Sequence, residues 1–178
     1  MPLHPSLVHL PLGLAVLMPF LAAGFGWAVW TGRVRLRAWA AVVALQAALV
    51  VGGLVALQSG KAEEERVESV VTDAAIETHE EAAELFLWAA GLTLVVAAGA
   101  FVGKAPVTRA AIGLSGVMMV GVLAAGIRVG HAGGQLVYAH NAASAYQTKT
   151  AATPGGAAAE SDDDERGPDG PRARQRER

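Results

Sequence analysis

The chain has 178 residues, of which 53% are hydrophobic and 17% are charged, and its formal net charge is −2 at pH 7. A soluble domain carries about 25% charged residues on average, so this composition excludes an ordinary soluble domain. Cysteine is absent, which excludes disulfides, thiolate metal sites, iron–sulfur clusters and covalent c-type haem attachment.

Four apolar stretches follow one another along the chain, and none of them contains Asp, Glu, Lys or Arg. Each is close to the roughly 20 helical residues needed to cross about 30 Å of hydrocarbon. They are apolar all round, without the polar face of a soluble helix. The sequence therefore predicts an all-α, integral-membrane four-helix bundle in residues 1–146. Its spans are expected at about 7–30, 39–57, 85–102 and 110–127, with the third and fourth helices extending outside the membrane.

Basic residues in the short loops predict the orientation of these spans. Arg33, Arg35 and Arg37 lie between the first and second spans, and Lys104 and Arg109 lie between the third and fourth. Short loops rich in Lys and Arg stay on the cytoplasmic side. Both termini are therefore expected outside.

All five histidines belong to this outer end of the predicted spans. His4 and His9 open the first span, His79 opens the third, and His131 and His140 follow the fourth. Ionisable groups near membrane segments are functional candidates, and imidazole is a common ligand of haem iron, zinc and copper. The outer face is therefore the predicted site of function.

An acidic stripe marks the start of the third helix. Glu77, Glu80, Glu81 and Glu84 recur at helical spacing, and His79 lies about 200° around the helix from Glu77 and Glu81. This pattern predicts carboxylates in water and His79 turned toward the bundle. The alternative for His79 is a half-buried imidazole satisfied by a carbonyl or by water.

Glycines punctuate the end of the fourth helix. Gly126, Gly130 and Gly134 recur every four residues, a small-residue track that lets another helix come close. Gly133 and Gly134 are adjacent and could bend the chain. We expect these four glycines to serve helix packing, either within the bundle or between copies of the chain.

The two histidines near this end cannot both face inward on a straight helix. His131 shares a face with Gln135 and Tyr138 if the helix continues, whereas His140 lies half a turn away. We expect His131 rather than His140 to point inward. At the other end of the chain, His4 and His9 are separated by about 140° on a helix, so each must find partners on other helices.

Short motifs along the chain together resemble those of a known family. Residues 4–11 read HPSLVHLP, Ser59-Gly60 follows the second span, His79-Glu80 opens the third, and residues 133–140 read GGQLVYAH. These motifs are similar to the HPxxVHFP and GGxLVYxHG patterns of the bacterial membrane proteins catalogued as domain of unknown function 2231, over roughly residues 1–145. Leu10 replaces the family's usual Phe, and Asn141 its usual Gly. The resemblance implies a four-helix domain in a bacterial inner membrane, with the histidines on the periplasmic face, and it brings no established activity.

Two hypotheses for function follow. In the first, the bundle binds one haem b near the outer face for electron transfer, with His79 and either His9 or His131 as axial ligands. Gly130 and Gly134 would make room for the ring. Helices of dihaem cytochromes carry paired histidines, and the helices of this chain do not, so at most one haem is expected.

The second hypothesis is a non-catalytic accessory or structural membrane subunit. Its histidines and Glu80 would pin the outer loops together or bind a divalent metal such as zinc or copper. His4, His140, Glu80 and Tyr138 are the weaker ligand candidates under either hypothesis. Transport is disfavoured because Gln46 is the sole amide deep in a span.

Residues 147–178 differ in character from the rest of the chain. From residue 151 onward no apolar residue is larger than alanine, and an acidic block precedes an arginine-rich end. Such composition predicts a disordered, charged tail. No phosphate loop, nucleophile elbow or nucleic-acid motif is recognisable. The expected partners are therefore the lipid bilayer, a redox or membrane-complex partner and a second copy of the chain, not nucleic acid, and catalysis by the chain alone is not expected.

Overall fold

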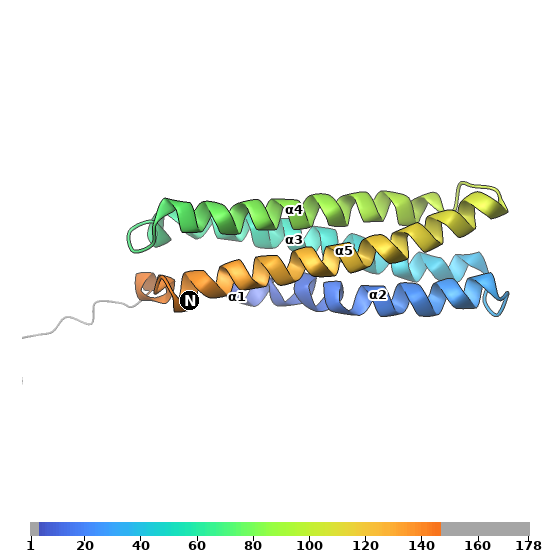
Figure 1. The fold of residues 1–178 in the computed structure, drawn as a ribbon, viewed down its shortest axis with the longest axis horizontal. Helices are drawn as coiled ribbons and strands as arrows, with labels where there is room; N and C mark the ends of the chain where they lie inside the picture. The colour runs from blue at the N-terminus through green and yellow to red at the C-terminus, as the bar shows by residue number, and fades with distance from the viewer. Residues whose placement is uncertain (1–3, 147–178) are drawn as a thin grey trace, which may run out of the picture. The chain divides into compact units, whose positions relative to one another are not determined.

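The computed structural model describes residues 4–146, which form four long helices (Figure 1). These are α2 (His9–Trp30), α3 (Ala40–Val67), α4 (Asp73–Gly99) and α5 (Ala105–Tyr138). The short helix α1 (His4–Leu7) precedes α2, and the 3-10 helices η1 (Leu36–Trp39) and η2 (Ala142–Tyr146) precede α3 and follow α5. Within this part of the chain there is no strand, which confirms the predicted all-α four-helix bundle. The predicted tail, 147–178, lies outside the described residues.

Within residues 4–146, four helical segments are long and apolar enough to cross a membrane. They are His4–Trp30, Leu36–Val67, Asp73–Gly99 and Ala105–Tyr138. The second segment continues to Val67, beyond the predicted end of its span at residue 57, because residues 61–66 (KAEEER) are good helix formers. These lengths support a multi-pass membrane protein.

The outer surface of the bundle is apolar in its middle. Phe20 is 70% exposed and Trp88 is 78% exposed, whereas the interior combines large side chains such as Trp39 with many small ones such as Ala90 and Ala97. Exposed large apolar groups suit a bundle surrounded by lipid, and small buried residues allow the close backbone approach that stabilises helix association there. The exposed side chains therefore fit contact with the bilayer.

Two buried side-chain hydrogen bonds connect the segment Leu36–Val67 to α4. The indole Nε1 of Trp39 donates a hydrogen bond to the carbonyl of Ala97 over 3.0 Å. The amide Nε2 of Gln46 donates to the carbonyl of Ala90, also over 3.0 Å. Both side chains are completely buried. Such pairing is required in a membrane interior, because no water is present to satisfy polar atoms.

The two ends of the bundle differ in their residues. At one end lie the connections that follow α2 and α4, which carry the basic residues (Figure 1). At the other end lie α1, the turn between α3 and α4, the end of α5, and η2. All five histidines belong to this second end, which we call the histidine end.

Candidate functional site

Two histidines from different helices meet at the histidine end. The ring centroids of His4, at the start of α1, and His79, in the second turn of α4, are 6.3 Å apart, and the ring planes are almost perpendicular at 89°. Both residues are half-buried. These two imidazoles form the centre of the candidate site.

The direction of His79 follows from the pattern of α4. Ile76, Ala82 and Phe86, on the same side of the helix, are buried in the bundle. On the opposite side, Glu77, Glu81 and Glu84 are exposed, and Glu80 is half-buried. The predicted inward orientation of His79 is therefore confirmed.

Two residues of α3, Ala56 and Ser59, set the orientation of His4. Its Nδ1 lies 2.9 Å from the carbonyl oxygen of Ala56 and 2.9 Å from the Oγ of Ser59. The Ser59 hydroxyl itself donates to the Ala56 carbonyl over 2.7 Å. A carbonyl oxygen can only accept, so Nδ1 of His4 carries the proton. In the neutral ring Nε2 then keeps its lone pair, which is the form that binds a metal ion.

Glycines make room for both rings. A Cβ atom built on Gly60 would lie 3.3 Å from Cε1 of His4, and one built on Gly133 would lie 3.1 Å from Cε1 of His79. Both distances are shorter than ordinary van der Waals contact. Each imidazole therefore occupies space that a side chain at the neighbouring position would need.

One nitrogen of the pair has no partner. Nδ1 of His79 is buried and makes no hydrogen bond with any residue in the described part of the chain. The backbone of Val129 lies near the ring, but it does not reach hydrogen-bond geometry with Nδ1. A buried polar atom without a partner costs stability, and it marks a place where a ligand or water could bind.

The remaining candidate ligands do not join this pair. His9, His131 and His140 are exposed, and Tyr138 is 91% exposed. The inward orientation expected for His131 is wrong. The helix α5 continues without interruption to Tyr138, and His131 is exposed on an outer face, where its Nε2 lies 3.2 Å from Nε2 of Gln135. The structure therefore brings His4, and neither His9 nor His131, to His79.

The four glycines of α5 that were predicted to serve helix packing divide into two groups. A Cβ on Gly126 would lie 3.3 Å from Cε2 of Phe86, and Gly133 abuts His79 as described above. For Gly130 and Gly134, in contrast, nothing in the described structure beyond their own helix lies within 4 Å of a built Cβ. Packing within this chain thus uses Gly126 and Gly133, two helical turns apart on one face.

Carboxylates do not complete a metal site around the pair. Among residues 4–146, no group of three or more His, Cys, Asp or Glu side chains is close enough to hold a metal ion. Structural zinc sites use four protein ligands and catalytic ones use three. The described part of the chain therefore offers two nitrogen ligands at most for one ion.

A second polar contact holds η2 against α3. The hydroxyl of Tyr146 donates to Oε2 of Glu63 over 2.5 Å, and the guanidinium of Arg66 lies 5.6 Å from the Tyr146 ring centroid. Burial raises the pKa of Tyr146 to about 12, and the hydrogen bond and negative charge of Glu63 add to the shift. This contact closes the end of the bundle beside the turn between α3 and α4.

Several residues of the site were not singled out from the sequence as site residues. Ser59, Gly60 and Tyr146 hold or flank the site, but none of these types signals a ligand in itself. Ser59-Gly60 belongs to the motifs of the resemblance.

No known protein family, curated protein or solved structure matches this chain.

Proposed function

We propose that this chain is a bacterial inner-membrane protein that binds one haem b at its periplasmic end, through His4 and His79, and takes part in electron transfer. The observation that carries the proposal is the pair of imidazoles, 6.3 Å apart, contributed by two different helices. A bound haem would supply one-electron chemistry there.

The separation of the rings suits two ligands of one metal. Imidazole nitrogens bind a transition metal at about 2 Å, so two rings at the separation of His4 and His79 could both hold one ion. His4 is oriented through its Nδ1 by Ala56 and Ser59, the type of outer-shell support that metal-bound histidines usually have. His79 provides a buried nitrogen without a partner.

Haem suits this donor set better than zinc. Zinc sites need at least three protein ligands, and residues 4–146 provide no group of three. A haem iron would take most of its donors from the macrocycle, so one or two ligands from the protein, here His4 and His79, would hold it. A pair of histidines is therefore sufficient for haem and insufficient for zinc.

The convergence of the motifs supports the resemblance to domain of unknown function 2231. Residues of all four motifs meet at one end of the bundle. His4 lies against Ser59, Gly60 and His79, and His79 in turn lies against Gly133. The bacterial membrane and the periplasmic placement of this end rest on the resemblance and on the basic loops at the other end.

A structural role for the pair is the second candidate. His4 already satisfies its Nδ1 within the chain, and both rings fill spaces next to glycines. In this reading the two histidines pin α1 and α4 together without binding a cofactor. His4→Ala and His79→Ala distinguish the two functions, because only haem ligation gives a visible spectrum that these substitutions remove.

A reduced-minus-oxidised visible spectrum tests the haem proposal. The full chain would be expressed with added haem precursor and purified in detergent. We expect a sharp alpha band in the unmodified protein and in the control variants His131→Ala and His140→Ala, whose rings are exposed and lie outside the pair. The band should be lost in His4→Ala and His79→Ala. A featureless spectrum, or a band that survives both substitutions, would contradict haem ligation by this pair.

The absence of cysteine allows a direct test of orientation. Ser69→Cys places a thiol in the exposed turn at the histidine end, and Thr31→Cys places one in the exposed connection after α2. In intact cells a membrane-impermeant thiol reagent should label Ser69→Cys, and it should label Thr31→Cys only after permeabilisation. The reverse pattern would place the histidine end in the cytoplasm.

A further inference from the structure

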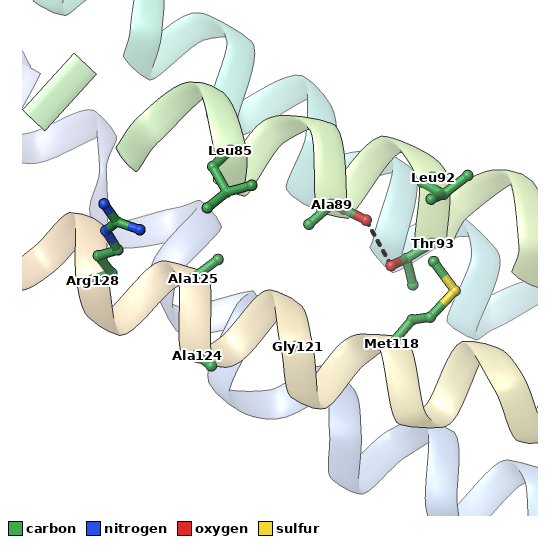
Figure 2. Close-up of a pocket in the computed structure, with 9 residues that line it drawn as sticks. All are labelled: Leu85, Ala89, Leu92, Thr93, Met118, Gly121, Ala124, Ala125 and Arg128. Atoms are coloured by element: carbon green, nitrogen blue, oxygen red, sulfur yellow. Dashed lines mark hydrogen bonds between the residues drawn. The ribbon is translucent and has the colours of Figure 1, made fainter. Parts of the chain in front are cut away.

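An open, mainly apolar groove runs along the outside of α4 and α5 (Figure 2). Its volume is about 470 Å³. Leu85 and Leu92 line it from α4, Gly121 and Ala125 line it from α5, and Met118 and Arg128 also line it. The Thr93 hydroxyl that borders the groove already donates to the carbonyl of Ala89. Among the described residues that line the groove, Arg128 therefore supplies the free polar side chain.

The length of the groove matches one leaflet of a bilayer. Met118 and Arg128 are ten residues apart on α5, which corresponds to about 15 Å along a helix. The hydrocarbon core of a bilayer is about 30 Å thick, so one leaflet accounts for about 15 Å. Arg128 directly follows the apolar run that ends at residue 127. The groove thus extends from the membrane surface at the histidine end to about the middle of the membrane.

The charge at the surface end of the groove has no counter-ion among residues 4–146. Arg128 is exposed, and no carboxylate of residues 4–146 forms an ion pair with it. An arginine near the end of a span extends its guanidinium to the membrane interface. Lipid phosphates are at this depth, and guanidinium binds phosphate through paired, charge-assisted hydrogen bonds.

We propose that this groove is a binding site for one anionic phospholipid. An acyl chain lies along the apolar part between α4 and α5, and the phosphate contacts the guanidinium of Arg128. A second copy of the chain could also cover the apolar part. None of the described residues that line the groove is acidic, so a second copy packed through the same groove would bring no anion to Arg128. The phospholipid is therefore favoured. The site is distinct from the histidine pair and does not depend on haem binding.

Native mass spectrometry of the full chain tests the proposal, with phosphatidylglycerol and phosphatidylcholine as probes at equal concentration. We expect the unmodified protein to retain phosphatidylglycerol about fivefold more strongly than phosphatidylcholine, the effect of one basic side chain at an anionic lipid surface. Arg128→Gln should abolish this preference, and Arg128→Lys should keep most of it. Gly121→Leu should reduce retention of both lipids, because it adds a side chain where the groove is empty.

Two matched controls remove similar groups elsewhere. Arg109→Gln removes an exposed positive charge of α5 outside the groove, and Gly24→Leu adds the same side chain at an open glycine of α2. Both should bind lipid as the unmodified protein does. Equal retention of the two lipids by the unmodified protein, or an unchanged preference in Arg128→Gln, would overturn the proposal. A dimer that Gly121→Leu dissociates, without a change in lipid retention, would assign the groove to a second copy instead.

Discussion

Gly133 of α5 lies against the imidazole of His79 on α4, so that a Cβ at position 133 would be 3.1 Å from Cε1 of the ring. This close contact lets a ring from one helix enter the space beside the backbone of the next. It also makes the position of His79 depend on a residue 54 positions later in the chain, which no local pattern around His79 reveals.

Paired glycine substitutions should show this dependence. Gly130→Ala adds a methyl group where the described structure leaves open space, and we expect it to stabilise the protein by about 1 kcal/mol through helix propensity. Gly133→Ala has the same propensity gain but must displace His79, which costs roughly 1–3 kcal/mol. Thermal unfolding in detergent should therefore rank Gly130→Ala above Gly133→Ala. Equal stability of the two variants would mean that the His79 ring moves away freely.

A double-mutant cycle should detect the contact between the two imidazoles. His4→Ala, His79→Ala and the double variant are expected to show a coupling free energy of about 0.5–1.5 kcal/mol, as for other edge-to-face ring pairs. A parallel cycle between His79 and the exposed His140 serves as the control and should give no coupling. Additive effects in the first cycle would show that the pair does not contribute to the free energy of unfolding.

Much of the fold could be predicted from the sequence, because the length and uniform apolarity of a span are local properties. The direction of His79 could also be predicted, since the Glu stripe and the apolar residues of α4 have a clear helical period. The partner of His79 could not. His4 is placed by hydrogen bonds to α3, with Ala56 lying 52 residues away, and such contacts depend on how the helices pack.

The backbone turns shortly after the end of α5 at an asparagine. Asn141 adopts a φ of 55°. Asparagine tolerates this left-handed region better than most residues. The backbone therefore turns here without glycine. The lipid groove, in contrast, had no signal in the sequence, because it arises between residues of two helices.

Replacement of the buried amide of Gln46 should be tolerated. Its Nε2 donates to the Ala90 carbonyl, but its Oε1 is buried and has no hydrogen-bond partner in the described part of the chain. Gln46→Met removes one hydrogen bond and one unsatisfied acceptor together, so we expect the free energy of unfolding to change by less than about 1 kcal/mol. Gln46→Glu is the contrasting variant and should destabilise the protein, because it buries a carboxyl group. A large loss in Gln46→Met would indicate a partner for Oε1, such as a bound water.

The contact between Tyr146 and Glu63 should make the docking of η2 depend on pH in the alkaline range. The pKa of Tyr146 is raised from 10.0 to about 12, first by burial and then by Glu63. A raised pKa means that folding favours the protonated phenol, so this contribution to stability is complete below pH 10 and is lost as the pH rises toward 12. Tyr138→Phe leaves Tyr146 as the sole tyrosine, and its phenolate absorbance then reports this titration directly. Adding Glu63→Gln should move the transition back toward pH 10, because it removes the negative charge beside the phenol. A transition near pH 10 before that substitution would show that η2 does not pack against α3 in solution.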